Sequence, residues 1–300
     1  MTADDGTTMT ADDDRTPMTA ESAPGPGPAA DPETERILAR YAAELPEPVP
    51  LIALWVHGSI AEGTDYRPGR SDLDLIAVLE RPCAPAEEER LAGLHRRLAR
   101  DEPLAARLHC SFMPVAELAD PGHDHLTWAF NELFRRPVSP VTRAELHRFG
   151  RVLHGRPVDG LLPGMTDRQL REYVHGQLRD ELLPRCADEE LFRQDTWVDY
   201  AMLALPRAAV TLTDGRLITK AEAFGVLAEL GAPAEVVADV RRRRYGAPGD
   251  GPDPAGDDPD SVGDGPDLAG DAEWLARRAR LTTDFLRSRA ETLIAAYHPG

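Results

Sequence analysis

Two short apolar runs with a polar segment between them constrain the fold more than any other feature of the chain. Residues 51–57 are apolar and are bounded by Pro50 and Gly58, and residues 73–79 are apolar again. Apolar runs of this length between turn-forming residues are typical of buried strands. We therefore expect two buried strands, joined by a segment that is polar and rich in turns.

The polar segment carries the strongest chemical signal. Gly58 permits a tight turn, so that nearby backbone N–H groups and the Ser59 hydroxyl can face an anionic phosphate. Asp72 and Asp74 are two residues apart on an extended chain, so both carboxylates point to one face while Leu73 points into the core. Two carboxylates beside a phosphate cradle suit a Mg²⁺ ion held jointly by protein and nucleotide. Each motif alone is common in solvated turns, but the combination favours a catalytic site.

The remaining pattern divides the chain into two parts. We expect an α/β N-terminal domain over residues 35–157, with a small mixed sheet and helices, and an all-α helical bundle over residues 165–300. Besides the two strands, the first part contains a third strand pattern at residues 107–113 and helical patterns at 35–44 and 84–100. After residue 166 only helical patterns occur, at 167–183, 193–213, 219–230, 234–244 and 272–296.

Two acidic segments account for most of the net charge of −18. Residues 1–34 contain eight acids and one arginine, and residues 246–271 contain eight aspartates and no base, which leaves −3 for the rest of the chain. Both segments are repetitive and poor in large apolar residues, so they cannot build a core. We expect them to be disordered.

Composition also excludes several classes of protein. The nearly neutral remainder lacks the basic stripe of a nucleic-acid-coating protein. No apolar run approaches the roughly 18 residues of a membrane span, and the N-terminus is too polar for a signal peptide. Cys83, Cys110 and Cys186 are far apart, without a disulfide or metal pattern. We expect a cytoplasmic monomer with reduced thiols and with no nucleic-acid or membrane partner.

The helical half contains a second notable segment. Residues 207–223 read Arg-Ala-Ala-Val-Thr-Leu-Thr-Asp-Gly-Arg-Leu-Ile-Thr-Lys-Ala-Glu-Ala, so that Arg207 lies on one predicted helix and Lys220 opens the next. Lys220 is the only lysine among 34 basic residues. In so arginine-rich a chain this indicates a position that needs a compact ammonium group, although composition alone supports chance equally well.

These motifs resemble those of a known enzyme family. The Gly-Ser turn followed by Asp-x-Asp resembles the signature of the polymerase-β-like nucleotidyltransferase superfamily, and residues 207–223 resemble the helical domain of the streptomycin/spectinomycin adenylyltransferases. The resemblance covers about residues 35–245 and is specific at the two motifs. It implies that the two aspartates hold Mg²⁺ and that ATP is the co-substrate. The residues that we expect to contact the nucleotide are Gly58, Ser59, Ser71, Arg207, Lys220 and Tyr245.

One position departs from the family pattern. The family carries a third carboxylate, the general base, on the strand that corresponds to residues 107–113, and here His109 stands where we would expect Glu. A neutral histidine can accept a proton near neutral pH. A histidine that is merely packed at a strand end is an equally good interpretation, so the base remains open between these alternatives.

The expected function is therefore Mg²⁺-dependent transfer of AMP from ATP to a hydroxyl of a small molecule, with release of pyrophosphate. The resemblance implies an acceptor like the aminoglycoside or aminocyclitol antibiotics, which are cationic, bound between the two domains. The alternative is a nucleotide-binding regulator or antitoxin-like module that has lost the base and does not turn over ATP.

Three weaker features remain. His123 and His125 resemble a metal-binding pair, but their position before an apolar segment favours a solvated loop followed by a helix. The four arginines at 241–244 favour a charged helix face near the nucleotide over an RNA-binding surface. Asp195 and Asp199 precede Arg207 on one predicted helix, either as acceptor contacts or, more simply, as exposed acids.

Overall fold

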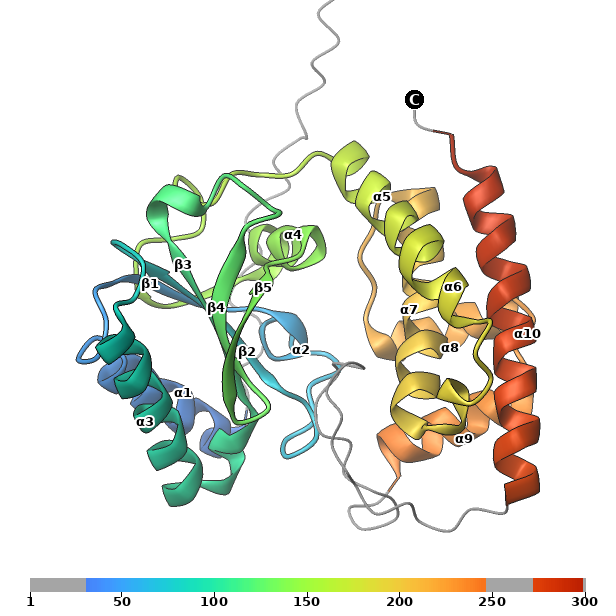
Figure 1. Ribbon diagram of the computed structural model, residues 1–300, viewed down its shortest axis with the longest axis horizontal. Helices are drawn as coiled ribbons and strands as arrows, with labels where there is room; N and C mark the ends of the chain where they lie inside the picture. Colours follow the sequence, from blue (N-terminus) through green and yellow to red (C-terminus); the bar gives the residue numbers. More distant parts are fainter. Residues whose placement is uncertain (1–30, 247–271, 299–300) are drawn as a thin grey trace, which may run out of the picture.

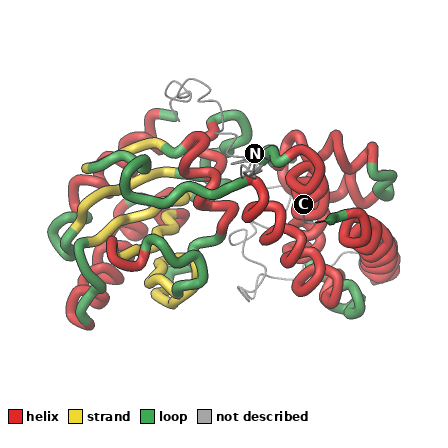
Figure 2. Tube along the Cα trace, turned by 90° about the horizontal axis from the view of Figure 1, so that it is seen from above, coloured by secondary structure: helices red, strands yellow, loops and turns green. Residues whose placement is uncertain are grey.

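The computed structural model describes residues 31–246 and 272–298 (Figure 1). A mixed sheet with helices ends at residue 155, and the described segments from residue 167 onward are helical. Figure 2 shows the two parts side by side, with all strands in one of them. The predicted fold class is thus confirmed. Residues 1–30 and 247–271, for which we expected disorder, lie outside the described residues, so that expectation stays a prediction.

Six strands form one sheet in the order β5-β4-β3-β2-β1-β6. β2 and β3 are parallel, whereas all other neighbours are antiparallel. Because parallel strands begin at the same edge, Asp74 of β2 lies directly beside His109 of β3. The strands are β1 (Leu51–Val56), β2 (Leu73–Leu79), β3 (Leu108–Pro114), β4 (Asp124–Ala129), β5 (Glu132–Pro137) and β6 (Arg151–Gly155).

Helices cover both faces of the sheet, and the alternation of β2 shows why. Leu75 points to one face, where it shares a core with Leu38 and Leu91 of helices α1 and α3. Ile76 points to the opposite face and packs in the core that contains Leu146 of α4. The helices of this part are α1 (Pro32–Glu44), α2 (Gly58–Glu62), α3 (Pro85–Asp101), η1 (Pro103–Arg107), η2 (Val115–Glu117) and α4 (Pro140–Phe149).

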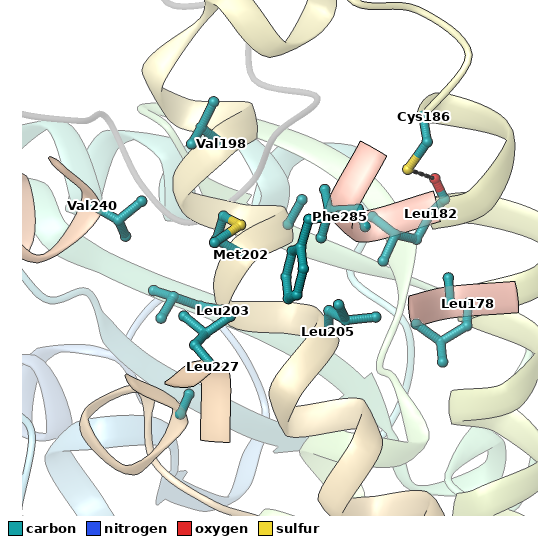
Figure 3. Packing of buried hydrophobic residues seen from close by; sticks show 14 of the residues in the cluster. Leu178, Leu182, Cys186, Val198, Met202, Leu203, Leu205, Leu227, Val240 and Phe285 are labelled. Atoms are coloured by element: carbon teal, nitrogen blue, oxygen red, sulfur yellow. Dashed lines mark hydrogen bonds between the residues drawn. The ribbon is translucent and has the colours of Figure 1, made fainter. Parts of the chain in front are cut away.

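Helix α7 is the centre of the helical part. It packs against α5, α8, α9 and α10, and Figure 3 shows its residues Met202 and Leu205 near Phe285 of α10 and Leu227 of α8 in one apolar core. The described helices here are α5 (Asp167–Gly176), η3 (Gln177–Leu182), α6 (Leu183–Arg185), η4 (Leu191–Arg193), α7 (Asp195–Asp214), α8 (Lys220–Glu229), α9 (Ala234–Tyr245) and α10 (Ala272–Ala296). None of the helices in the described ranges is long and apolar enough to cross a membrane.

Strands β4 to β6 and helix α4 were absent from the sequence prediction. The apolar segment after His125, which we interpreted as a helix, is a hairpin of β4 and β5. Its turn residues Phe130 and Asn131 have φ angles of 52° and 62°. A two-residue hairpin turn with two positive φ angles usually shows itself by glycine, which is missing here, so the sequence offers no turn signal.

The N-terminal acidic segment ends earlier than expected. Residues 31–34 were assigned to the tail, but Asp31 is the N-cap of α1 and accepts hydrogen bonds from the N–H groups of Glu33 and Thr34, both at 3.2 Å. Pro32 at the first helical position favours the same start. The side chain of Thr34 is fully buried.

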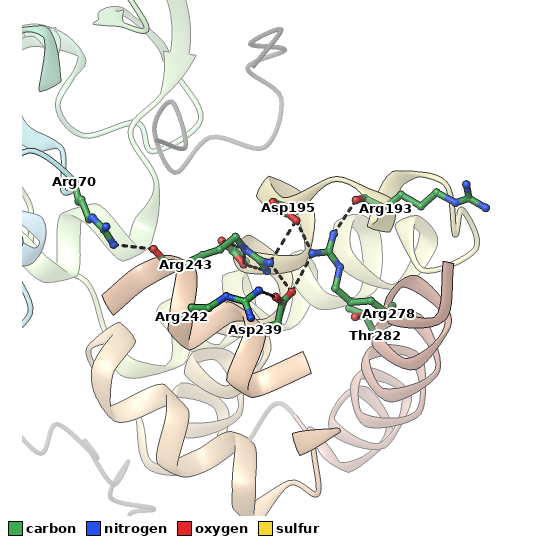
Figure 4. A network of polar contacts seen from close by, with 9 residues as sticks. Arg70, Arg193, Asp195, Asp239, Arg242, Arg243, Arg278 and Thr282 are labelled. Carbon is green, nitrogen blue, oxygen red and sulfur yellow. Dashed lines mark hydrogen bonds and ion pairs between the residues drawn. The ribbon is translucent and has the colours of Figure 1, made fainter. Parts of the chain in front are cut away.

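A buried network of charges ties α7 to α9 and α10 (Figure 4). Nε of Arg243 lies 3.0 Å from both carboxylate oxygens of Asp199, and Arg278 donates to Asp239 at 3.0 Å and to Asp195 at 2.5 Å. Only 8% of the Arg243 side chain is exposed. Asp199 is therefore no simple exposed acid, because Arg243 occupies both of its oxygens, and Arg243 and Arg278 also lie against Oδ1 of Asp195, whose side chain is 36% exposed. Arg241 and Arg242 are exposed on α9, as expected for a charged helix face, whereas the side chain of Arg243 is largely buried, contrary to the expectation.

Candidate active site

The Gly-Ser turn lies where β1 passes into α2. Gly58 has a φ of +67°, and a Cβ atom there would stand 2.7 Å from Oδ2 of Asp74. A side chain at this position would both strain the backbone and push the carboxylate away. The backbone N–H of His57 donates to the carbonyl of Asp74 at 3.0 Å, which fixes the turn against β2. Glycine is thus required for the close approach of the turn to the carboxylate.

Asp72 and Asp74 flank Leu73 at the start of β2, and the predicted alternation is confirmed, since Leu73 is fully buried. Nδ1 of His109 lies 3.8 Å from Oδ2 of Asp72 and 3.9 Å from Oδ1 of Asp74. Nη1 of Arg107 lies 3.8 Å from Oδ1 of Asp72. Burial raises the pKa of Asp72, with Asp74 adding to the effect, while His109 and Arg107 oppose it.

These carboxylates fit a divalent cation. Asp72 is buried next to a second carboxylate, and burial and Asp74 both raise its pKa, so its anionic form calls for further compensation by positive charge. A hard cation bound to both groups would supply that compensation, and carboxylate oxygens are the ligands that Mg²⁺ prefers. The two residues can therefore hold the metal that the motif implies.

Arg207 and Lys220 reach the same place from the helical part. Nε of Arg207 donates to the carbonyl of Ile218 at 3.1 Å, which ties α7 to the segment before α8. Lys220 is the first residue of α8, after the N-cap Thr219, whose hydroxyl accepts from the N–H of Glu222. Burial lowers the pKa of Lys220 to about 7, and Arg244 and Arg207 lower it further. The site thus concentrates positive charge close to the carboxylate pair.

Most of the predicted residues line one pocket between the two parts of the chain. Seven of the nine predicted site residues line it, together with further polar residues that the sequence analysis did not single out. The predicted lining residues are Gly58, Ser59, Ser71, Asp72, Asp74, Arg207 and Lys220; the additional polar ones are Glu62, Asp65, Arg70, Glu145, Thr219, Glu222 and Arg244.

His109 and Tyr245 are the two predicted residues outside that lining. His109 faces a second hollow, formed with Arg107 and Phe130, and its ring meets Phe130 edge to face at 4.9 Å. Asp72 lines both hollows, so it separates them. The hydroxyl of Tyr245 donates at 2.9 Å to Asp65, which does line the pocket, and a contact of Tyr245 with the nucleotide stays a prediction.

Glu145 is the most important site residue that the sequence analysis missed. Its carboxylate accepts a hydrogen bond from Nδ1 of His57 at 3.3 Å and lies 3.5 Å from Nη2 of Arg207. Burial opposes ionisation of both groups, yet their mutual hydrogen bond lowers the pKa of Glu145 and raises that of His57, which favours the ion pair. Ser139, which caps α4, followed by Pro140 was the available signal for this helix.

Arg244 and Arg70 join the two parts of the chain beside the pocket. Arg244 donates to Asp65 at 2.9 Å, and Arg70 donates to the backbone carbonyls of Arg243 and Arg244 at 2.8 and 3.1 Å. Four positive side chains, those of Arg70, Arg207, Lys220 and Arg244, therefore line a pocket that also holds the carboxylates of Asp72 and Asp74. This arrangement can bind a polyanion together with a cation.

Comparison with known proteins gives a likeness of fold. No family model matches the chain, and no curated protein matches it by sequence. Among solved structures, it is similar to that of the spectinomycin adenyltransferase AAD(9) from Enterococcus faecialis with ATP and spectinomycin. The two share 17% identity with a TM-score of 0.54, over 86% of this chain and 97% of the other. The chain thus has a nucleotidyltransferase-like fold, in which a mixed sheet is followed by a helical part.

Proposed function

We propose that the protein is a Mg²⁺-dependent nucleotidyltransferase that moves AMP from ATP to a hydroxyl group of a small molecule. The observation that carries this proposal is the single pocket in which Asp72 and Asp74 from the sheet face Arg207 and Lys220 from the helical part. The similar structure, that of spectinomycin adenyltransferase AAD(9) with ATP and spectinomycin, supports the same chemistry.

The chain's own groups divide the work of binding. Arg207 and Lys220 attract the phosphates and neutralise charge that develops on the leaving pyrophosphate. Ser59 and Ser71 donate to phosphate oxygens from the sheet side, where Ser71 is held by a hydrogen bond from the N–H of Arg67 at 3.0 Å. ATP would raise the pKa of Lys220, since the phosphates supply the negative charge that its surroundings lack.

Asp72 and Asp74 would hold the metal, which supplies charge neutralisation and orientation of the phosphates when bound. In the transfer, the acceptor oxygen forms a bond to the α-phosphorus, and the bond from that phosphorus to the bridging oxygen breaks. The proton of the acceptor hydroxyl passes to a base on the protein, and pyrophosphate leaves.

The base is either His109 or Glu145, and the two hollows separate these alternatives. His109 lines the hollow next to Phe130, whereas Glu145 lines the pocket between the two parts, so each would serve a hydroxyl bound on its own side. Glutamine replaces either side chain with little change of volume. The variant that lowers kcat while leaving ATP binding intact identifies the base and, with it, the side from which the acceptor approaches.

We further propose a cationic acceptor of the aminocyclitol or aminoglycoside class, which would make the protein an antibiotic-modifying enzyme. Besides the carboxylate pair, the pocket is lined by four acidic side chains, those of Glu62, Asp65, Glu145 and Glu222. Ammonium groups of such an acceptor would pair with those carboxylates that the arginines leave accessible. We also propose that residues 35–157 and 165–300 form the two domains and that the protein is a cytoplasmic monomer.

A nucleotide-binding regulator is the second candidate, and the histidine at position 109 favours it, because the expected third carboxylate is missing there. Such a protein would bind ATP in the same pocket without transferring AMP. The two candidates therefore predict equal ATP binding and different turnover.

The deciding experiment is a screen of aminocyclitol and aminoglycoside acceptors with Mg²⁺ and labelled ATP. Acceptor-dependent pyrophosphate release and an acceptor heavier by one AMP support the transferase. Asp74→Asn should abolish both, whereas Asp159→Asn, at a side chain that is 92% exposed and remote in sequence from the motif, should change neither. ATP binding without any transfer would support the regulator instead, and the absence of ATP binding would contradict both candidates.

A further inference from the structure

Glu117, His123 and His125 come together at the end of the sheet opposite to the carboxylate pair. Glu117 ends η2, which follows β3, and the two histidines lie at the start of β4, the next strand of the sheet. One ligand atom from each residue lies within 4.8 Å of those of the other two. Nε2 of His123 is 3.0 Å from Oε2 of Glu117, and Nδ1 of His125 is 3.8 Å from the same oxygen.

His125 is the residue that calls for an explanation. Its side chain is fully buried, and neither ring nitrogen has a hydrogen-bond partner in the part of the chain that the structure covers. A neutral imidazole carries one N–H donor and one acceptor nitrogen, and buried polar atoms are nearly always paired. The Thr127 hydroxyl donates to the backbone carbonyl of His125 at 3.3 Å and lies 2.9 Å from the Ser111 hydroxyl, so it gives the His125 ring no partner.

Burial favours the neutral form of the His125 ring, which is the form that binds metals. Burial lowers its pKa to about 4, and the neighbouring His123 and Arg143 lower it further, while Asp120 and Asp124 act in the opposite direction. Nδ1 or Nε2 can therefore offer a lone pair at neutral pH.

The backbone around the cluster is held in place. The buried guanidinium of Arg143 donates to the carbonyls of Leu118, Asp120 and Val138 at 2.5, 3.0 and 3.2 Å. The N–H of Gly122 donates to the Asp120 carboxylate at 2.8 Å, which closes the turn before β4. The loop that connects Glu117 to the histidines is thus a firm support for a ligand cluster.

We propose that Glu117, His123 and His125 bind a Zn²⁺ ion that links η2 to the start of β4. Two imidazole nitrogens and one carboxylate oxygen are a common zinc donor set, and a fourth, tetrahedral position would be open to water. Bonds of about 2.0–2.1 Å place tetrahedral donors about 3.3 Å apart. The widest separation must therefore shrink by at most about 1.5 Å. The His123 side chain, which is 42% exposed, is free to make that movement.

This metal site is separate from the carboxylate pair. β3 runs from beside Asp74, at His109, to Pro114, which is about 17 Å at 3.3 Å per residue. The zinc proposal therefore stands or falls independently of the proposed nucleotidyl transfer. Its structural effect would be to fasten the connection between two neighbouring strands.

Zinc titration of the full chain in competition with a chromophoric chelator tests the proposal. The Asp74→Asn variant serves as background, because the carboxylate pair with His109 is another group that could hold Zn²⁺. We expect one Zn²⁺ per chain with a Kd below about 1 µM. His123→Ala and Glu117→Gln should each weaken binding more than about 100-fold, because outer-shell partners alone are worth 10–100-fold.

Two further measurements guard against a trivial result. His154→Ala, at an exposed histidine of β6, is the matched control and should bind Zn²⁺ normally. Co²⁺ in place of Zn²⁺ should give the visible absorption of a four-coordinate ion in the background variant and lose it with Glu117→Gln, whose circular dichroism reports whether it is folded. No binding below about 10 µM, or unchanged binding in both His123→Ala and Glu117→Gln, would overturn the proposal.

Discussion

Replacing Lys220 by methionine should make the unliganded protein more stable and its ATP complex weaker. The ammonium of Lys220 lies among Arg207 and Arg244, and burial together with these charges lowers its pKa from 10.5 to about 7. Unfolding returns the ammonium to water and relieves this penalty. Methionine keeps most of the aliphatic chain and carries no charge, so the folded state of Lys220→Met no longer bears the cost.

The size of the effect follows from the pKa difference. At 1.36 kcal/mol for each pKa unit, a fall from 10.5 to about 7 corresponds to at most about 4.8 kcal/mol. Lys220 keeps partial contact with solvent, so only part of this penalty operates. We expect the free energy of unfolding of Lys220→Met to exceed that of the wild type by about 1–3 kcal/mol, or about 2–10 °C in Tm.

The pH dependence has a defined sign. Between about pH 7 and 10.5 the unfolded chain binds the Lys220 proton and the folded chain has released it. In that window the free energy of unfolding of the wild type rises with pH, because the unfolded state holds more protons. The penalty is fully present below about pH 7 and disappears above about 10.5. The Tm advantage of Lys220→Met should therefore shrink as the pH rises from 7 to about 9.

Calorimetric titration with Mg²⁺ and ATP completes the test. Losing one charge-assisted hydrogen bond to phosphate costs about 1.5–3 kcal/mol, which weakens binding about 10- to 150-fold. Lys220→Arg is the matched control, since it keeps a positive charge and should keep part of the ATP affinity without the gain in Tm. The reasoning is refuted if Lys220→Met is less stable than the wild type at pH 7 and binds ATP equally well.

Three further substitutions test the site and its support. Glu145→Gln should lower the free energy of unfolding most between about pH 4.5 and 6.5, because the raised pKa of His57 and the lowered pKa of Glu145 keep both groups charged in the folded protein there. Denaturant unfolding at several pH values measures this effect, and a pH-independent difference from the wild type contradicts it. Arg243→Met should destabilise the protein by about 3–5 kcal/mol, since Asp199 loses its guanidinium partner while Asp195 and Asp239 each lose one of theirs and keep Arg278, and a Tm equal to that of the wild type would rule out the network as a support. Gly58→Ala should remove transferase activity, because its Cβ would displace the Asp74 carboxylate; retained kcat would show that the close approach is unnecessary.

Features that depend on neighbouring residues could be predicted from the sequence alone. Strands β1 and β2 were predicted because each is a short apolar run between turn residues, and the common face of Asp72 and Asp74 was predicted because side chains alternate along a strand. Helix α8 was placed within a residue of its observed start by its helical pattern at residues 219–230, and in the structure Thr219 and Glu222 form a capping box there. Each of these patterns is complete within a few residues of chain.

Features that depend on contacts between distant segments required the tertiary structure. The β4–β5 hairpin escaped prediction because Phe130 and Asn131 adopt positive φ angles without glycine. Glu145 escaped because its pairing with His57 joins residues 88 apart in the sequence. His125 was expected in a solvated loop, which is wrong, because the pairing of β4 with β3 and β5 buries its ring completely.

The chemical state of the site was decided by packing rather than by residue type. The sequence by itself determined that an Asp-x-Asp strand and a lone lysine at a helix start exist in one chain. Only the tertiary structure decided that Lys220 lines the pocket of Asp72 and Asp74, and that Tyr245 and His109 lie outside the lining of that pocket. The physical reason is that burial and Coulomb interactions, which set the charge state of each site residue, depend on distances between the two parts of the fold. A local pattern of residues cannot predict those distances.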